Sequence, residues 1–161
     1  MRNLALGKTI VLMNPYSARY PGSGIATLID GRRGSLDHGD GSWQAYEGVD
    51  LEASIDLGEA APVRRITAGF LSNPSAWIFL PNEVEIAVSR DGTHYDVVKK
   101  IQTEQNVVDL TPRTQDFEAR LSTPSPVRYI RVTGRNIGVC PAEHPGAGEK
   151  AWLFADEIVV E

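Results

Sequence analysis

The sequence has little of what several protein classes require. Among its 161 residues there is one cysteine, Cys140, so no internal disulfide can form. Lysine and arginine number 16 against 21 aspartate and glutamate residues, which gives a formal net charge of −5. Broad binding to nucleic acid or anionic lipid needs a positive surface field, so this charge balance argues against both.

Long hydrophobic runs are also missing. The apolar run Thr9–Met13 is too short for the core of a signal peptide, and Asn14 and Pro15 follow it at once. No stretch approaches the length needed to cross a bilayer. The chain is therefore expected either to stay where it is made or to be one part of a longer exported protein.

What is present fits one globular domain spanning residues 1–161. The hydrophobic fraction is 42% and the charged fraction 23%, both ordinary for such a domain. A chain of this size buries roughly 70% of its unfolded surface, so it needs no disulfide to fold. The sequence contains no internal repeat, low-complexity tract or linker.

Apolar residues recur with a period of two, which is typical of strands with one buried face. Helical periodicity is confined to Ser23–Ile29, where Ser23 is predicted to cap a turn or two that Gly31 ends. Arg90–Thr93 predicts a hairpin turn, because its Asp-Gly pair supplies a positive φ. The predicted strands are Leu51–Leu57, Ile66–Phe70, Ile78–Leu80, Glu83–Ser89, Tyr95–Ile101, Phe117–Leu121, Val127–Thr133 and Leu153–Val160.

Many short strands separated by turn residues predict an all-β fold, a β-sandwich or jelly roll. Binding residues are found on loops more often than on strands. Four segments are predicted to be loops: Asn14–Ser23, Gly31–Ser42, Ser72–Ala76 and Gly134–Lys150.

The loop Gly31–Ser42 is rich in oxygen donors. Asp30 precedes it, and it holds Ser35, Asp37 and Asp40 among several glycines. Calcium takes such carboxylate, hydroxyl and carbonyl oxygens, although the spacing is not that of an EF-hand. From composition alone, a calcium site and an acidic solvated loop are both consistent with this segment.

Candidates for catalysis are few. Asp156 and Glu157 are adjacent in a predicted strand, so they should point to opposite faces and cannot act as a glycosidase pair, although one of them could reach a cation. His38, His94 and His144 lack zinc spacing. Cys140, four residues before His144, is expected to be a packed or idle loop thiol.

Trp77 suggests a different kind of site. It follows the turn-rich loop Ser72–Ala76, and the C–H faces of sugars stack on aromatic rings while Asn, Asp, Arg or His side chains bond their hydroxyls. Trp77 beside Asn73 is such a combination, but Trp77 could equally begin a strand and pack in the core. Tyr16 and Tyr20 could line a site or cover the end of the sandwich. Trp43 and Trp152 are expected in the core.

An ordered set of motifs then resembles the discoidin, or coagulation factor V/VIII C-type, module. Within that group the sequence is most similar to family 32 carbohydrate-binding modules, and two stretches, Asp30–Ser35 with Gly41–Gly48 and Ala151–Ile158, resemble the C-terminal modules of bacterial, chitobiase-like β-hexosaminidases. The motifs are NLALGK (Asn3–Lys8), ATLIDG (Ala26–Gly31), GSWQAYEGVDL (Gly41–Leu51), SIDLG (Ser54–Gly58), VSRDG (Val88–Gly92), RYIRV (Arg128–Val132) and ADEI (Ala155–Ile158).

The resemblance implies a discoidin-type, galactose-binding-domain-like jelly roll with a structural calcium ion. Its implied ligands are the side chains of Asp30, Ser35 and Glu157 and the carbonyls of Thr27, Arg32 and Asp156. The loop before Trp43 is longer than is common in the family, so Asp37 or Asp40 is the alternative to Ser35.

The resemblance also implies a sugar site on the loops at one end. By position it would include the side chains of Trp77, Asn73, His38, Tyr20, His144 and Arg135. The implied ligand is a terminal galactose, N-acetylgalactosamine or N-acetylglucosamine, held with weak affinity.

The resulting hypothesis is a non-catalytic, monomeric carbohydrate-binding module of a secreted or surface glycoside hydrolase such as a β-hexosaminidase. Its partners would be a glycan and a catalytic domain in the same polypeptide, and its location would be extracellular, periplasmic or at the cell surface. A structural spacer that packs on its parent enzyme is the alternative. A lipid-binding discoidin domain is disfavoured by the negative charge, and an independent enzyme by the scattered titratable groups.

Overall fold

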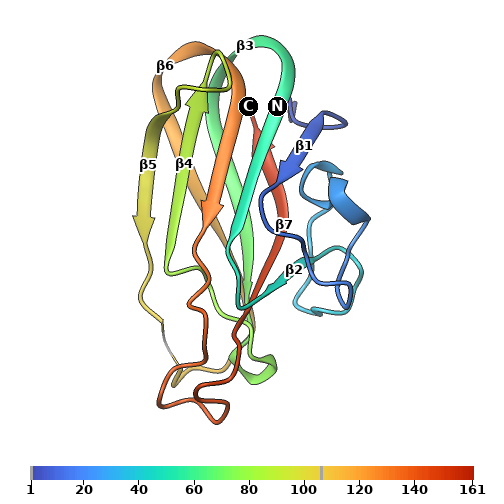
Figure 1. The fold of residues 1–161 in the computed structure, drawn as a ribbon, viewed down its shortest axis with the longest axis vertical. Helices are drawn as coiled ribbons and strands as arrows, with labels where there is room; N and C mark the ends of the chain where they lie inside the picture. The colour runs from blue at the N-terminus through green and yellow to red at the C-terminus, as the bar shows by residue number, and fades with distance from the viewer. Residues whose placement is uncertain (1, 106) are drawn as a thin grey trace.

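The computed structural model describes residues 2–105 and 107–161, and most of its regular structure is β-strand (Figure 1). Two short 3-10 helices accompany the strands. In chain order the elements are β1 (Thr9–Leu12), η1 (Gly24–Ile29), β2 (Gln44–Glu47), β3 (Leu51–Ser72), η2 (Pro74–Ala76), β4 (Glu83–Ser89), β5 (Asp96–Gln102), β6 (Arg113–Gly134) and β7 (Trp152–Val160).

The two longest strands, β3 and β6, each bend over the same end of the molecule (Figure 1). The first arm of β3 pairs with the second arm of β6, with Leu51 opposite Gly134. The second arm of β3 pairs with the first arm of β6, with Ser72 opposite Arg113. Breaks in register between Asp56 and Ala61 mark the bend. The two strands therefore form nested arches that link two layers.

The remaining strands extend these two layers. In the first layer β1 adds to the first arm of β3, and β4 joins the second arm of β6 to β5. In the second layer β7 adds to the second arm of β3, and β2 adds to β7. All of these pairings are antiparallel. The result is the predicted jelly-roll β-sandwich.

The main core lies between the two layers because alternate residues of each strand point inward. Leu51, Ala53, Ile55 and Leu57 are buried, as their alternation predicted. A smaller apolar cluster covers the other side of the second layer, beneath the loops before and after η1. It contains Trp43, Ala45, Leu71, Ile78, Trp152 and Phe154.

The sequence predicted most strands correctly but not every detail. The segment Ile78–Leu80 is buried without forming a named strand, since only isolated bridges involve Ile78. The predicted cap of η1 is wrong, because the Ser23 side chain makes no capping bond. Instead the backbone N–H of Ser23 donates to Oγ1 of Thr27 at 2.8 Å.

The two ends of the sandwich differ. The arches, the β4–β5 hairpin and both chain termini lie toward one end. η2 and the segments 103–105, 107–112 and 135–151 lie toward the other (Figure 1). The termini are joined through the N–H of Leu4, which donates to the carbonyl of Val160 at 2.7 Å. Within the described residues, no helix has the length and apolar character needed to cross a bilayer.

Candidate functional site

Trp77 stands out at the end of the sandwich opposite the arches. It follows η2, its side chain is 38% exposed, and its φ is 65°, the one positive value at a non-glycine residue in the described chain. Bulky residues rarely adopt this left-handed conformation, and such outliers concentrate at binding and catalytic sites. The exposed ring excludes the alternative in which Trp77 packs wholly into the core.

The surroundings of Trp77 hold it in that conformation. Its N–H donates to the carbonyl of Pro74 at 2.9 Å, and its own carbonyl accepts from the N–H of Trp152 at 2.9 Å. A Cβ on Gly146 would lie 2.7 Å from Cε2 of Trp77, so the backbone of the last long loop packs directly on the ring. The ring position is thus fixed by three separate chain segments.

His144 packs against the buried side of Trp77 and is only 5% exposed. The N–H of Gly146 donates to Nδ1 of His144 at 2.9 Å, so Nε2 carries the proton and donates to the carbonyl of Pro74 at 2.7 Å. Its ring meets that of Trp77 edge-on, with centroids 6.2 Å apart. Both ring nitrogens are used within the protein, so His144 positions Trp77 and has no free nitrogen to offer a sugar hydroxyl.

A hollow of about 500 Å³ opens beside the Trp77 ring. Its volume lies in the range of small-molecule sites. Both aromatic and ionisable side chains line it, which suits a ligand with apolar faces and many hydroxyls. The lining residues are Arg19, Tyr20, Glu47, Ala76, Trp77, Glu149, Lys150 and Trp152.

One wall of the hollow is a packed group of rings. Tyr20 lies edge-on to Trp152, with centroids 5.5 Å apart, and His38 lies edge-on to Tyr20 at 5.7 Å. The guanidinium of Arg19 sits over both Tyr20 and Trp152, 5.7 and 5.6 Å from their ring centres. This wall is a rigid surface with a cation held along its edge.

The structure brings only part of the predicted sugar set together. Trp77 and Tyr20 line the same hollow, and His38 lies behind Tyr20. Asn73 starts η2 through its carbonyl, which accepts from the N–H of Ala76 at 2.9 Å, and its side chain does not line the hollow. Arg135 also lies outside it, because its Nη1 donates to Oδ2 of Asp50 at 3.1 Å.

Sequence reasoning missed several residues of the hollow. Arg19, Glu149 and Lys150 were within segments predicted to be functional loops, but nothing in their spacing distinguished them. Trp152 was expected to be core, and it is indeed 8% exposed, yet its remaining surface faces the hollow. Tyr16 is half-buried against the main core and so covers the sandwich.

A second group of interest is acidic and lies where the chain termini meet the loop after η1. Glu157 is 2% exposed, and both of its oxygens accept from the N–H of Gly31 at 3.1 Å. Asn3 donates to Oε1 at 3.1 Å. Burial, together with the negative charges of Asp30 and Asp156, raises the pKa of Glu157 to about 8, although the bond from Gly31 lowers it.

The neighbouring Asp156 is also buried, but a cation already satisfies it. Its Oδ2 accepts from Nε of Arg33 and from the N–H of Gly34, each at 2.9 Å. A register shift between β3 and β7 falls between Ala155 and Ile158, at the two acids. The expectation that adjacent strand residues must face apart is therefore wrong here, since both carboxylates bond backbone N–H groups of the same loop.

The predicted loop ligands beyond Asp30 bond one another instead. The hydroxyl of Ser35 donates to Oδ2 of Asp40 at 2.7 Å and accepts from the N–H of Asp37 at 3.2 Å. Three backbone bonds of the same loop use Asp37 and Asp40 as well. Ser35, Asp37 and Asp40 thus shape the turn, and their part in binding calcium stays a prediction.

The implied calcium site can be tested on the remaining donors. Oδ2 of Asp30 is buried and has no hydrogen-bond partner, while Oδ1 accepts from the N–H of Arg32 at 2.8 Å. An unpaired buried carboxylate oxygen whose charge raises the pKa of a second carboxyl group suits a hard cation. In the described residues no cluster of three or more His, Cys, Asp or Glu side chains is arranged for a metal. Asp30 and Glu157 could supply two carboxylates to such an ion, and the carbonyls of Thr27, Arg32 and Asp156 remain the further ligands that the resemblance implies.

Cys140 behaves as the packed thiol that was predicted. It is buried in a small cluster with Phe79 and Ala151, and burial raises the pKa of its thiol. Its Sγ lies 4.0 Å from the carbonyl of Lys150, and His144 bonds elsewhere. A Cys–His nucleophile is not formed.

Comparison by sequence identifies no relative. No protein-family profile matches the chain, and no curated protein matches it.

Solved structures do share its fold. A chitosan-binding module from a chitosanase/glucanase of Paenibacillus sp. IK-5 aligns with a TM-score of 0.65 at 20% identity, over 100% of this chain and 99% of that chain. A Clostridium perfringens module, CpGH89CBM32-4, in complex with GlcNAc-α-1,4-galactose gives 0.61 at 15% identity, over 99% and 94%. A module named CBM32-1, from a family 31 glycoside hydrolase of Clostridium perfringens, gives 0.59 at 16% identity, over 99% and 96%. These likenesses confirm the jelly-roll fold.

Proposed function

We propose that this chain is a non-catalytic carbohydrate-binding domain whose sugar site is the hollow beside Trp77. The observation that carries the proposal is the exposed indole ring, held in a strained backbone conformation next to unpaired polar side chains. A pyranose stacks its C–H face on such a ring and bonds its hydroxyls to the carboxylate and guanidinium groups around it. The similar structures that bind chitosan or GlcNAc-α-1,4-galactose lend support, since they share this fold.

The roles within the site follow from the contacts. Trp77 is the stacking platform, and Trp152 and Tyr20 form the wall beside it. Glu47, Glu149 and Lys150 are available to hydroxyls, because in the described chain none of them takes part in an ion pair or a side-chain hydrogen bond. His144 positions Trp77 and is not itself a sugar ligand. His38, Asn73 and Arg135 lie outside the lining of the hollow and have no assigned role in it.

The ligand class is a terminal sugar such as galactose, N-acetylgalactosamine or N-acetylglucosamine. A shallow hollow buries few ligand atoms, so a single site should bind in the high micromolar to millimolar range. Such weak binding is useful when it is repeated or tethered, because the effective concentration then rises. The domain would serve as an accessory module of a secreted glycoside hydrolase, such as a β-hexosaminidase, and hold it near its substrate.

We also propose a structural calcium ion bound by Asp30 and Glu157. The support is the unpaired Oδ2 of Asp30 and the raised pKa of Glu157. A divalent cation would give Oδ2 of Asp30 a partner and would lower the pKa of Glu157. The ion would join the loop after η1 to β7 and to the N-terminal segment. It would have no part in sugar chemistry.

The test is a glycan-array screen in calcium buffer, followed by calorimetry with any sugar that binds. Trp77→Ala should weaken binding at least tenfold, because it removes the whole stacking surface, whereas Trp77→Phe should retain much of it. Val97→Ala, an exposed change on β5, is the matched control and should leave affinity unchanged. If the folded protein binds no glycan, the structural spacer becomes the better description.

A further inference from the structure

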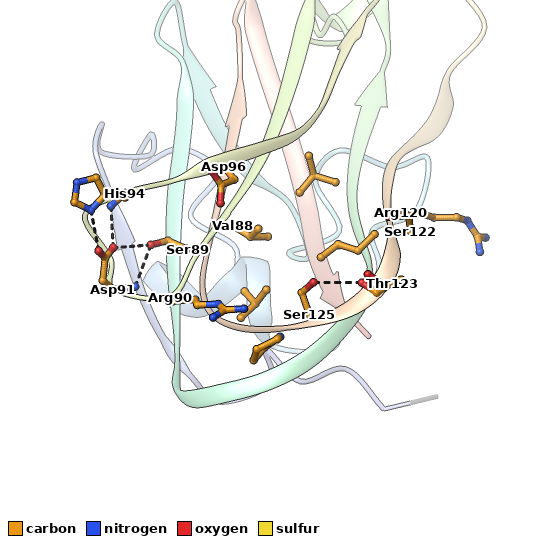
Figure 2. A pocket seen from close by; sticks show the side chains of 14 residues that line it. Val88, Ser89, Arg90, Asp91, His94, Asp96, Arg120, Ser122, Thr123 and Ser125 are labelled. Carbon is orange, nitrogen blue, oxygen red and sulfur yellow. Dashed lines mark hydrogen bonds and ion pairs between the residues drawn. The ribbon is translucent and has the colours of Figure 1, made fainter.

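A second hollow, of about 600 Å³, lies at the end of the sandwich opposite Trp77 (Figure 2). It is bounded by the β4–β5 hairpin on one side and by the arch of β6 on the other. It shares no lining residue with the hollow beside Trp77. The proposed sugar site does not account for it.

The floor of this hollow is aliphatic. Val88 and Val127 belong to the main core, and Val98 and Leu121 pack against it half-buried. Val98 and Leu121 are accessible because β5 pairs only with β4, and the first arm of β6 pairs only with β3, so the two layers part at this edge. The aromatic platform of a sugar site is replaced here by branched aliphatic side chains.

Most polar groups at the rim are already satisfied. Asp91 accepts from the backbone N–H groups of Thr93 and His94, each at 2.8 Å, and its Oδ2 lies 2.8 Å from Nδ1 of His94. Arg120 pairs with Glu118, and its guanidinium points away from the hollow (Figure 2). These groups stabilise the turn and the strand, so they do not call for a ligand.

Two opposite charges of the lining, Arg90 and Asp96, are solvent-exposed and have no counter-charge within the described residues. Asp96 lies directly opposite Val88 in the β4–β5 ladder, and Arg90 follows Val88 by two positions. Paired residues share one face of a hairpin, so Asp96 lies on the same face as Val88, which points into the core, and Arg90 lies in the bend just after β4. Figure 2 shows the guanidinium of Arg90 directed into the hollow. Across residues 2–105 and 107–161, neither charge has an ion-pair or side-chain hydrogen-bond partner.

We propose that this hollow binds a small aliphatic zwitterion, an apolar amino acid or dipeptide. The carboxylate of the ligand would pair with Arg90, whose planar guanidinium suits two-point bonding, and its ammonium would pair with Asp96. The aliphatic side chain would cover Val98 and Leu121. A neutral sugar would leave both charges without a counter-charge and would find no indole or phenol ring in this lining.

A purely structural account of Asp96 makes a different prediction. Inward-pointing charges on an edge strand can prevent two copies of a chain from pairing edge to edge. On that account Asp96→Asn would promote self-association and would have no effect on any ligand. The two accounts are separated by combining binding and oligomer measurements on the same variants.

The experiment is titration of the ¹⁵N-labelled protein, followed by NMR, with three matched probes. L-leucine carries both charges, N-acetyl-leucine lacks the ammonium, and leucinamide lacks the carboxylate. Signals of the β4–β5 hairpin and the β6 arch should shift with leucine, and each blocked probe should bind at least fivefold more weakly, because one charge-assisted bond is lost.

Each substitution that removes a charge should then abolish the preference for leucine over one of the two blocked probes. Asp96→Asn should make leucine and N-acetyl-leucine equivalent, and Arg90→Gln should make leucine and leucinamide equivalent. Both of these changes are at exposed side chains, and the amide spectrum reports whether the fold is retained. Trp77→Ala should bind leucine as the unaltered protein does, which keeps this site separate from the proposed sugar site.

Three results would overturn the proposal. The first is that 20 mM leucine, roughly the weakest useful range for such a site, leaves hairpin and arch signals unmoved. The second is that the three probes bind with equal affinity, which would show that the hollow does not recognise the charges of the ligand. The third is that Asp96→Asn raises the apparent mass in size-exclusion chromatography while the ligand preference stays the same, which assigns Asp96 to edge protection.

Discussion

At the scale of single residues, Trp77 is the residue on which the proposed sugar site at the end opposite the arches depends. A left-handed φ at a bulky residue costs about 1–3 kcal/mol, so neighbouring contacts must offset it. His144 and Gly146 supply those contacts, one as a hydrogen-bonded support and the other by leaving room for the ring. The contacts that hold Trp77 in its strained backbone conformation therefore also hold its exposed ring in place.

Gly146→Ala tests that arrangement without touching the ring. The new Cβ would lie 2.7 Å from Cε2 of Trp77 and 3.2 Å from Nδ1 of His144, so the indole must move. Gly146 does not have a positive φ, and alanine therefore adds only a steric effect. We expect sugar affinity to fall at least fivefold and the tryptophan fluorescence to shift, with a stability loss of about 1 kcal/mol.

The control is Ala147→Ser, a change at the neighbouring exposed residue. It should leave both fluorescence and affinity as they are. If Gly146→Ala shifts the fluorescence yet keeps full sugar affinity, Trp77 is not the stacking platform.

At the scale of elements, Arg33 binds the loop after η1 to the strands of the second layer. Its Nε bonds Asp156 on β7 at 2.9 Å, and its Nη2 bonds Asp116 on β6. Between them it passes over Gly69 of β3, where a Cβ would lie 2.5 Å from Nη2. One side chain thus connects a long loop to three strands, and only glycine at position 69 leaves it room.

Arg33→Ala should lower the free energy of unfolding by about 2 kcal/mol. The loss arises because Asp156, 1% exposed, keeps its charge without its cation. It stays below the roughly 3–5 kcal/mol of a fully buried pair because the Arg33 side chain is itself 45% exposed and screened by water.

Urea denaturation measures this change. Arg128→Ala removes a surface pair with Asp56 and is the matched control, for which a clearly smaller effect is expected. Equal effects of the two substitutions would show that Arg33 contributes only as a surface charge.

At the scale of the whole molecule, Glu157 connects segments from both ends of the chain. It bonds Asn3 and Gly31, and Asn3 in turn accepts from the N–H of Val160 at 2.9 Å. Closure of the sandwich at this end therefore depends on how the charge of Glu157 is neutralised. Protonation and a bound cation are the two ways to neutralise it.

This dependence predicts how stability changes with pH. The pKa of Glu157 is raised to about 8 in the folded state from about 4.3 in an unfolded chain. The folded state therefore holds the proton more tightly, and in chelator the free energy of unfolding should fall as pH rises from about 5 to about 8. The slope is at most about 1.4 kcal/mol per pH unit for one proton.

Calcium should remove most of that slope, because the ion replaces the proton between Asp30 and Glu157. Glu157→Gln, which carries no charge, should also remove it in chelator and should no longer respond to calcium. Thermal or urea unfolding at several pH values measures both effects. A slope that is the same with and without calcium would contradict the proposed ion.

Much of the fold could be predicted from the sequence. The alternation in Leu51–Leu57 predicts which side chains are buried, since a strand turns each residue to the opposite face. In Glu83–Ser89 it predicts the burial of Val84, Ile86 and Val88, but Ala87 and Ser89 are buried as well. The nested arches could not be predicted, because local patterns do not show that one strand continues through a bend into a second layer. Gly58, with a φ of 87° at the bend of β3, ends the motif Ser54–Gly58, but nothing in that motif indicates a bend.

The candidate site divides in the same way. Trp77, Asp30 and Glu157 could be singled out from residue type and local context, because a ring beside a turn-rich loop suits stacking and carboxylates suit a hard cation. The sequence by itself determined the layered all-β fold and these chemical types. Only the tertiary structure decided that His144 supports rather than binds, that Arg135 pairs with Asp50, and that Arg19, Glu149 and Lys150 share a hollow with Trp77. Partners far apart in the chain are chosen by packing, and packing is set by distances that no local pattern contains.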